Sequence, residues 1–441
     1  MCILFAIMTI HNGYKNHHHH QHHLVQKLFF LFALVIIYTT SCITATRIGV
    51  NRHGGGNEAV KCKDDSGNDV DWFIAYKFPK IHDSANPYIR QGLGYAFVLP
   101  GQSDWQVSVG KGIDNPDSLV GWTLRPLFHE DVNTTTNLAY IAYNDQPPTG
   151  PTIDSGGHTK GVIITKYQGG LWLQHSVPHF PNLQDKYSYP KTGENNGQVF
   201  HCLTLELDQV DNVGNILEFT KPHVFNFSIP DELGKSLPNL EKVVRHGHAK
   251  LAEIMMSLDA ADYYQFVDLY NNSATNGNND AYYTYKTKSD LNYQVVQIKN
   301  ADRVLDCYAK GPSFHEEIYS GWIAGSLKSE LDVQSWLNGP NPYPSNCTSS
   351  STKVYNIEDK DVAGVRFSTH HDHAKWAVAT QRPVVCIGDL NRMEHQTKRG
   401  GTVNCFTEKA VWKIFKGMVV TTQPCPKPKK LAKLSKIKLR S

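Results

Sequence analysis

Several motifs that commonly mark an enzyme's chemistry are missing from this 441-residue sequence. It has no Cys-x-x-Cys pair of the kind zinc ribbons use, and no His-Glu-x-x-His motif of a zinc protease. It has no Gly-x-Ser-x-Gly nucleophile elbow and no phosphate-cradling glycine-rich loop. Beyond the N-terminal segment, no apolar run is long enough to cross a membrane. Any catalytic chemistry must therefore come from other residues.

The first 45 residues differ in composition from the rest of the chain. They hold a histidine run at 17–23 and, after Lys27, an apolar run of 11 residues at 28–38, followed by small and polar residues. This run is short for a transmembrane helix, which favours a signal peptide at about 24–45 over a membrane anchor. We therefore exclude 1–45 from the fold and predict a lysosomal or secreted protein without stable membrane association.

Cysteines and glycosylation signals agree with export. Seven cysteines lie beyond the leader, and an exported chain meets an oxidising compartment, so disulfides are expected with one thiol left over. Four Asn-x-Ser/Thr sequons are candidate glycosylation sites: Asn133, Asn226, Asn271 and Asn346.

The formal net charge of +3 is unevenly distributed. Residues 46–425 hold 35 basic and 41 acidic side chains, whereas the tail 426–441 holds seven basic side chains and no acidic one. Fifteen histidines lie outside the leader, and imidazole ordinarily gains its charge between pH 8 and 5. Acidification should therefore make the body positive and strengthen its binding to a polyanion. The tail is predicted to be a disordered basic arm.

Apolar periodicity and turn residues predict a mixed α/β fold. The expected strands are 70–78, 94–99, 161–165, 171–173, 331–337, 376–379 and 384–387. The expected helices are 231–270, 319–327 and 410–415, and the expected loops are 145–157, 271–280 and 359–374.

One short unit occurs twice, about 215 residues apart. In each copy a His-x-Lys pair precedes a strand, a turn and a second strand, and a polar residue follows 18 residues after the histidine: Ser176 after His158 and Asn391 after His373. Such a repeat suggests a pseudo-twofold molecule with one copy in each half. We expect an N-terminal half at 46–230 and a C-terminal half at 231–425.

Two His-x-Lys pairs meeting at one pocket would suit a phosphodiester. On a strand, alternate side chains face the same way, so each histidine would project with its lysine. One imidazole could attack phosphorus while the other protonates the leaving oxygen and then activates water. The lysines could stabilise phosphoryl oxygens, a task that metals perform elsewhere, so no metal or other cofactor is expected. The predicted catalytic residues are His158, Lys160, His373 and Lys375, and the predicted supporting or phosphate-binding residues are His175, Ser176, Asp389, Asn391 and Arg392.

Other clusters have simpler explanations. A third copy, His248-Ala-Lys250, lies in a helix-like stretch where residues two apart face different ways, and we interpret it as surface. The run His370-His371-Asp372-His373 resembles a metal site, but adjacent histidines in a loop rarely converge on one ion. Arg399-Gly-Gly could contact phosphate or form a turn. Trp322, Trp336 and Trp376 are expected in the core.

The blocks around both pairs resemble the deoxyribonuclease II family. They include Ser155-Gly-Gly-His158-Thr-Lys160, Gly170-Leu-Trp-Leu-Gln-His175-Ser-Val-Pro-His-Phe-Pro181, Asp372-His373-Ala-Lys375-Trp and Cys386-Ile-Gly-Asp-Leu-Asn391-Arg. Further matches, such as Val70-Asp-Trp-Phe-Ile-Ala-Tyr-Lys77 and Tyr319-Ser-Gly-Trp-Ile-Ala324, extend the resemblance over about 60–425.

The resemblance implies a phospholipase D-like pseudodimer: two α/β halves, each with a central mixed sheet, and one active site at their interface. It implies acid, metal-independent endonucleolytic cleavage of double-stranded DNA to 3′-phosphates, through a phosphohistidine, in lysosomes or outside the cell. The four His-x-Lys residues match the family's catalytic set, with His175 as a supporting member. Family disulfides would join Cys62 to Cys202, Cys347 to Cys425 and Cys386 to Cys405, leaving Cys307 unpaired.

Two alternatives remain at this stage. A lipid phosphodiesterase of the phospholipase D type would need an Asp five residues after each lysine, and Thr165 and Thr380 stand there instead. A catalytically inactive, secreted DNA-binding or immunomodulatory relative is the other, although both pairs are intact. The family's vertebrate members commonly have Cys where this chain has Ala377, a position without an inferred role.

Overall fold

The computed structural model describes residues 59–128, 137–184, 186–244 and 293–426. The predicted signal peptide, the third His-x-Lys copy, the expected loop 271–280 and the tail beyond 426 lie outside these residues, as do the sequons at Asn133 and Asn271. Along the described ranges, no helix has the length and apolarity needed to cross a membrane.

The N-terminal sheet is antiparallel throughout, and its strand order within the described residues is β10-β6-β7-β8-β9-β3-β4-β5. Its strands are β3 (Trp72–Lys77), β4 (Tyr95–Val98), β5 (Gln106–Val107), β6 (Ala139–Asn144), β7 (Lys160–Lys166), β8 (Gly169–His175), β9 (Gln198–Leu205) and β10 (Val224–Ser228). A separate hairpin joins β1 (Cys62–Lys63) to β2 (Asp69–Val70).

The C-terminal sheet contains one parallel pair, β13 with β14, among antiparallel neighbours. Its order is β11-β12-β18-β17-β16-β13-β14-β15, and β19 also pairs with β14. The strands are β11 (Tyr293–Asn300), β12 (Arg303–Lys310), β13 (Leu331–Gln334), β14 (Val354–Val362), β15 (Val365–Ser368), β16 (Trp376–Ala379), β17 (Val384–Gly388), β18 (Gly401–Thr407) and β19 (Val419–Thr422).

The α-helices within the described ranges are mostly short. They are α3 (Pro87–Gln91), α4 (Leu119–Leu124), α5 (Leu207–Thr220), α6 (Asp231–Gly234), α9 (Ala324–Leu327) and α10 (Lys409–Met418), with a π-helical turn η4 at Tyr319–Ile323. Short 3-10 turns are η1 (Arg125–Leu127), η2 (Lys191–Gly193), η3 (Pro312–Phe314), η5 (Thr369–His371) and η6 (Glu394–Lys398).

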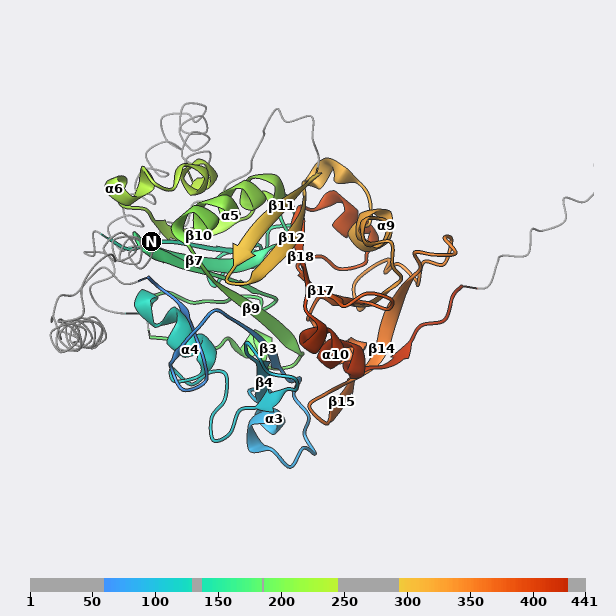
Figure 1. Ribbon diagram of the computed structural model, residues 1–441. Helices are drawn as coiled ribbons and strands as arrows, with labels where there is room; N and C mark the ends of the chain where they lie inside the picture. Colours follow the sequence, from blue (N-terminus) through green and yellow to red (C-terminus); the bar gives the residue numbers. More distant parts are fainter. Residues whose placement is uncertain (1–58, 129–136, 185, 245–292, 427–441) are drawn as a thin grey trace, which may run out of the picture. The chain divides into compact units, whose positions relative to one another are not determined.

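Helix α5 joins the two sheets into one hydrophobic core (Figure 1). Its apolar residues recur at helical spacing, and Val213 and Ile216 belong to the same buried cluster as Trp172 on β8 and Leu305 on β12. A separate cluster under α4 covers the other face of the N-terminal sheet, and one under η4 and α9 covers that of the C-terminal sheet. The fold is therefore two α/β halves that share a continuous core.

The two halves repeat the same strand neighbours. The run β7-β8-β9-β3 in one sheet corresponds to β16-β17-β18-β12 in the other, all antiparallel, and α5 and α10 follow β9 and β18. The strand pairings that fix the register join Gly161 to Gln174 and Trp376 to Ile387. Because the second hairpin is shorter, Ser176 corresponds to Asp389, and the expected match of Ser176 to Asn391 is wrong.

Most expected elements are confirmed, with one clear exception. The seven expected strands overlap β3, β4, β7, β8, β13, β16 and β17, and the helices over 319–327 and 410–415 are present as η4 with α9 and as α10. The loop expected over 359–374 is wrong, because β14 and β15 form a hairpin there around Ala363 and Gly364. Lys360 and Val362 are buried and lie two residues apart, as on one face of a strand. The charged residues around them made this strand look like a loop in the sequence.

The helix expected over 231–270 begins as the short α6, and helical structure resumes at 238–244, where the described segment ends. This segment packs on α5, because the backbone N–H groups of Asn239 and Leu240 donate to the Asp211 carboxylate. We therefore propose that the division between the halves falls after residue 244 and not at 230.

All three expected disulfides are present, and Cys307 is free and buried. Of the two sequons within the described ranges, Asn226 lies on β10 and Asn346 lies in a loop, both half-buried. Glycosylation stays a prediction at all four asparagines.

Candidate active site

Both His-x-Lys pairs lie where the chain enters a strand. Lys160 is the first residue of β7, and His158 precedes it. His373 and Lys375 come directly before β16. The expectation that the pairs lie on the strands is therefore wrong for three of the four residues, although their segments are extended. Both lysines are buried, with exposed fractions of 3% for Lys160 and 1% for Lys375.

Each catalytic-candidate histidine is held by the opposite half of the molecule. His158 Nδ1 lies 3.0 Å from the carbonyl oxygen of Asp389, and His373 Nδ1 lies 2.8 Å from that of Ser176. A carbonyl only accepts, so both rings carry a proton on Nδ1. The neutral ring then presents the lone pair of Nε2. The two contacts are equivalent under the pseudo-twofold repeat, because Ser176 and Asp389 are counterparts.

The backbone of each histidine is also fixed across the halves. His158 N donates to Gly400 O at 2.8 Å, and His373 N donates to Gly197 O at 2.8 Å. Neither position has room for a side chain. A Cβ at Gly197 would lie 2.6 Å from Asp372 Oδ1, and a Cβ at Gly400 would collide with the carbonyl of Thr220. We name the segments 194–197 and 396–400 the crossing loops.

Asp145 is a site residue that the sequence analysis missed. Its carboxylate pairs with Lys160 and lies 3.4 Å from Arg399 Nη2 and 3.9 Å from His158 Nε2. Burial alone would raise the pKa of Asp145, but the neighbouring cations hold it below its usual value. Arg399 also donates to the carbonyls of Gly156 and Gly157, so it holds the 145–157 loop in place.

The four groups share one electrostatic environment. Burial lowers the pKa of His373 well below its usual value, and Lys375, Lys160 and His158 lower it further. Burial also lowers the pKa of His158, where Asp145 opposes the shift and Lys160 and Lys375 add to it. Burial and Lys160 lower the pKa of Lys375 as well. These mutual effects indicate that the two His-x-Lys pairs lie close to each other.

Lys375 folds back on its own histidine. Its Nζ donates to His373 O at 2.7 Å and lies beside the imidazole, 3.1 Å from Nδ1 and 3.2 Å from Nε2. A positive charge beside the ring adds to the effect of burial and favours the neutral imidazole. The neutral form of the His373 ring is therefore the favoured one.

The other expected site residues divide into two groups. Ser176 and Asp389 touch the histidines through their carbonyls, while the Ser176 hydroxyl donates to Gln198. His175 accepts from Val177 N and packs against Phe180, and burial followed by Lys160 lowers its pKa to about 3, so it stays neutral.

Asn391 and Arg392 bond to other parts of the C-terminal half. Asn391 Oδ1 accepts from Trp336 N at 3.2 Å, which anchors the segment after β13. The buried Arg392 guanidinium bonds Asn356 and Pro344 O and lies 3.4 Å from Glu317, inside the C-terminal half. These contacts assign Arg392 to the core of that half, so we no longer expect it to bind phosphate.

Trp336 breaks the symmetry of the site. It is half-buried, and its ring centroid lies 5.5 Å from that of His373, so the expectation that it lies in the core is wrong. Trp376 is fully buried in the core as expected, and the half-buried Trp322 packs against the core. Trp336 follows β13 as Asp145 follows β6, the counterpart strand. His158 therefore faces a carboxylate where His373 faces an aromatic ring.

Asp389 gives the fold a pH dependence that can be measured. Burial raises its pKa to about 7, although Thr402 N donates to the carboxylate. An unfolded Asp titrates near 3.9, so its contribution to stability is complete below about pH 4 and is lost as the pH rises towards 7. Asp389→Asn should remove this loss. We expect the difference in unfolding free energy between the variant and wild type to shift by roughly 3 kcal/mol in favour of the variant as the pH rises from 4.5 to 7, measured by urea denaturation. An unchanged difference across that range would contradict a buried, protonated Asp389.

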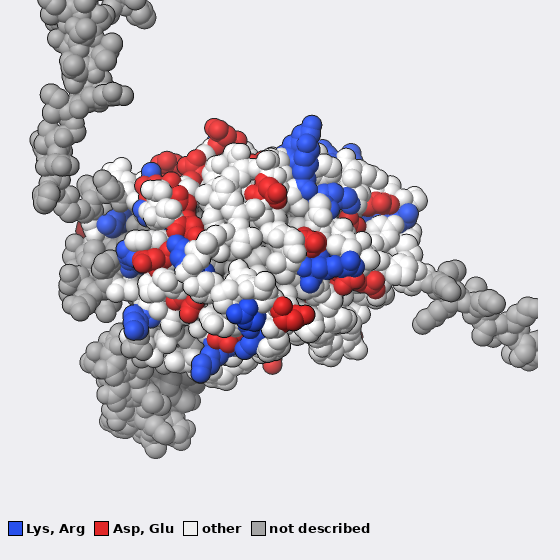
Figure 2. All heavy atoms as spheres, turned by 90° about the horizontal axis from the view of Figure 1, so that it is seen from below, with Lys and Arg blue, Asp and Glu red and all other residues white. Residues whose placement is uncertain are grey.

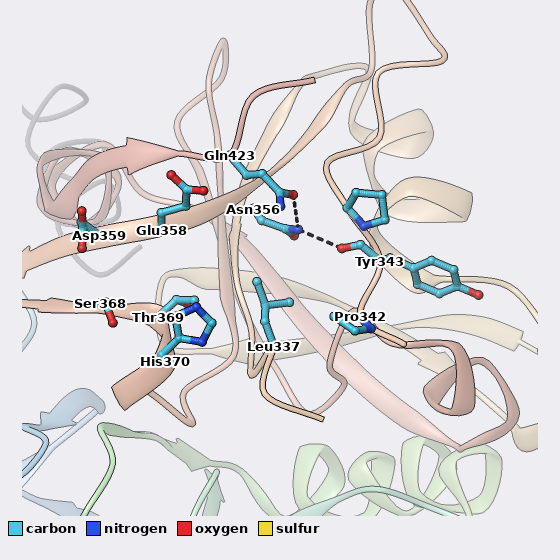
Figure 3. Close-up of a pocket in the computed structure, with 11 residues that line it drawn as sticks. Leu337, Pro342, Tyr343, Asn356, Glu358, Asp359, Ser368, Thr369, His370 and Gln423 are labelled. Carbon is cyan, nitrogen blue, oxygen red and sulfur yellow. Dashed lines mark hydrogen bonds between the residues drawn. The ribbon is translucent and has the colours of Figure 1, made fainter. Parts of the chain in front are cut away.

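A pocket of about 430 Å³ lies beside the segment that leads to His373 (Figure 3). Leu337, Pro342, Tyr343 and His370 line it, together with Glu358 and Asp359 of β14. None of the four His-x-Lys side chains lines it. Its acidic residues make it unsuited to a phosphate, so we do not place the scissile bond there.

Within the described ranges, no group of three or more His, Cys, Asp or Glu side chains lies close enough together to hold a metal ion. In the run 370–373, Asp372 instead bonds Tyr76 and lies 3.1 Å from Lys360 Nζ.

Comparison with known proteins identifies the family that this arrangement matches. The family described as Deoxyribonuclease II matches residues 61–425. Deoxyribonuclease-2-alpha of Rattus norvegicus is 34% identical over 377 residues, which cover 83% of this chain and 95% of the relative. Plancitoxin-1 of Acanthaster planci is 30% identical over 398 residues, covering 89% and 99% of the two chains. Cell-death-related nuclease 7 of Caenorhabditis elegans is 29% identical over 373 residues, covering 84% and 89%.

Proposed function

Because the chain belongs to the deoxyribonuclease II family, we propose that it hydrolyses DNA phosphodiesters endonucleolytically, at acid pH and without a metal, leaving 3′-phosphates. One observation carries this proposal: the imidazoles of His158 and His373 are oriented by reciprocal hydrogen bonds across the two halves, with two buried lysines beside them.

The first step needs a neutral nucleophile and a protonated acid. We assign the nucleophile to His373, because Lys375 lies beside its ring and disfavours its protonation, whereas at His158 the Asp145 carboxylate opposes that effect. We assign the acid to His158, because Asp145 lies 3.9 Å from its Nε2 and stabilises the imidazolium. His373 Nε2 bonds to phosphorus, the P–O5′ bond breaks, and His158 gives its proton to O5′.

The second step reverses the proton transfer. His158, now neutral, takes a proton from water, whose oxygen attacks phosphorus while the His373–phosphorus bond breaks. The product is a 3′-phosphate, and His158 regains the proton it needs for the next cycle. Lys160 and Lys375 stabilise the negative phosphoryl oxygens in both transition states.

The acid preference follows from the same residues. Burial lowers the pKa of both histidines, so protonating His158 requires a lower pH than protonating an exposed histidine.

Binding of the DNA substrate is a second cause of the acid preference. Figure 2 shows a face on which Lys and Arg alternate with Asp and Glu, not a continuous basic surface. Protonation of carboxylates and histidines on such a surface strengthens its attraction for DNA.

The setting is proposed on the same basis. An acidic optimum, three disulfides and the predicted signal peptide fit a lysosome or the extracellular space. The name of the Caenorhabditis elegans relative, Cell-death-related nuclease 7, fits a role in degrading the DNA of dying cells.

Plasmid nicking in the presence of EDTA tests the proposal. At pH 5, the relaxation of supercoiled plasmid should proceed at the same rate within about twofold with and without EDTA, and it should fall steeply towards pH 8. Supercoiled DNA that survives at pH 5 would refute nuclease activity and leave an inactive DNA-binding relative. Loss of activity only with EDTA would refute metal independence. Release of a lipid headgroup in place of nicking would favour the lipid phosphodiesterase.

A further inference from the structure

Two buried lysines outside the His-x-Lys pairs occupy equivalent positions in the two halves. Lys77 is the last residue of β3, and Lys310 is the last residue of β12, the counterpart strand. Their exposed fractions are 0% and 1%. Neither was a candidate site residue in the sequence analysis, because each is a single cation at the end of an apolar strand.

Both lysines bind backbone carbonyls of a crossing loop. Lys77 Nζ donates to Glu194 O at 2.9 Å and to Asn196 O at 2.5 Å. Lys310 Nζ donates to three carbonyls: Gln396 O at 3.2 Å, Thr397 O at 3.1 Å and Arg399 O at 2.6 Å. In each loop the last carbonyl bound belongs to the residue immediately before the glycine that contacts a histidine.

The contacts then cross to the other half. Gly197 O accepts from His373 N, and Gly400 O accepts from His158 N, both at 2.8 Å. Lys77, in the N-terminal half, is therefore linked through its loop to the histidine of the C-terminal half. Lys310, in the C-terminal half, is linked in the same way to the histidine of the N-terminal half.

A buried ammonium that donates its hydrogen bonds to carbonyls, with an aromatic ring nearby and no hydrogen-bonded carboxylate among the described residues, is a costly way to stabilise a fold. Removing such a cation from water is unfavourable, and an apolar side chain of similar volume often serves stability equally well. Three N–H donors in one group, however, can hold several carbonyls of one loop in a single arrangement. The recurrence of this arrangement at both symmetry-related positions argues for a common purpose at the site.

We propose that Lys77 and Lys310 are positioning residues, and that Lys77 fixes the backbone of His373 while Lys310 fixes the backbone of His158. This inference rests on the proposed function for its kinetic consequence, but the crossed structural link can be tested without DNA cleavage.

The test compares Lys77→Met and Lys310→Met, with the exposed Lys235→Met as a control for loss of a lysine. Each buried variant should lower kcat at pH 5 by about 10- to 100-fold, with KM within about twofold, because small displacements of a reacting group are costly and DNA contacts are retained. The control should match wild type. A change in KM alone would contradict positioning.

The decisive readout is the imidazole signal of each histidine by NMR on 15N-histidine-labelled protein. Spectra of His158→Ala and His373→Ala assign the two Nδ1–H signals. Lys77→Met should shift the His373 signal and leave the His158 signal in place, and Lys310→Met should do the reverse. If either variant shifts both signals alike, or neither, the proposal is overturned.

Folding is checked by cooperative thermal unfolding. Should a methionine variant fail to fold, Lys77→Gln and Lys310→Gln keep an N–H donor and are read by the same crossed criterion. If the wild type does not nick DNA, the proposed function fails, but a crossed NMR pattern would still support the positioning link. Nicking without a crossed pattern would sustain the function and remove the inference.

Discussion

His158→Ala and His373→Ala are each expected to lower the rate of plasmid nicking at pH 5 by about 10⁴-fold or more. Without His373 there is no nitrogen to form the bond to phosphorus, and without His158 there is no proton for O5′. Because the two histidines act together in one reaction, removing either one already abolishes most of their joint contribution to the rate. The double variant should therefore be little slower than either single variant.

The fold should survive these substitutions. Each one removes a ring that donates a hydrogen bond to a carbonyl of the opposite half, at a cost of about 1–3 kcal/mol. His248→Ala is the matched control, because it alters the third His-x-Lys copy, which we interpret as surface, and it should nick at the wild-type rate. Nicking above about one-tenth of wild type by either active-site variant would remove that histidine from the mechanism.

Asp145→Asn should have the next largest effect on catalysis. The substitution keeps the shape of the side chain but removes the charge that raises the pKa of His158. His158 would then need more acid to become protonated, so the alkaline limb of the kcat profile should move down by about one pH unit. At pH 5 the rate should fall by about 100-fold, because Lys160 also loses its carboxylate partner.

The cost in stability separates this effect from simple unfolding. Breaking a buried pair by removing one partner destabilises a fold by roughly 3 kcal/mol. The control Asp117→Asn removes a carboxylate from the exposed pair with Arg125 and should change neither rate nor pH profile. A folded Asp145→Asn protein with the wild-type pH profile would show that Asp145 does not tune His158.

The sequence predicts the reactive pairs because their chemistry is local. A histidine and a lysine two residues apart, followed by a strand hairpin, can be recognised within about twenty residues, and the duplication supports a two-fold arrangement. The disulfides were inferred from the family resemblance alone, and the structure confirms all three. Cys62 and Cys202, for example, are separated by 140 residues and lie on adjacent parts of the N-terminal half.

The residues that orient the pairs could not be predicted in this way. His158 and the carbonyl that binds its ring are 231 residues apart, and Arg399 is 254 residues from Asp145. No periodicity links such positions, since a backbone carbonyl or a glycine carries no side-chain signature. Asp145 fell in a segment whose proline and glycine content predicts a loop, and the loop is present, but its first residue is a buried ion-pair partner.

The difference between the halves is equally hidden in the sequence. The repeat predicts two equivalent histidines, and only the strand registers reveal that Asp145 and Trp336 occupy matching places beside them. Equivalent rings with unequal neighbours can take unequal parts in a reaction. The assignment of nucleophile and acid therefore depends on tertiary contacts and not on the motif.

DNA with a sulfur in place of the scissile O5′ tests the central claim most directly. A thiolate leaves without protonation, so this substrate does not need the acid. We predict that His158→Ala cleaves it at a rate near wild type and accumulates DNA joined to His373, detectable by denaturing gels and peptide mapping, while His373→Ala stays inactive. Cleavage by His373→Ala, or no rescue of His158→Ala, would contradict a reaction shared between these two imidazoles at one phosphate.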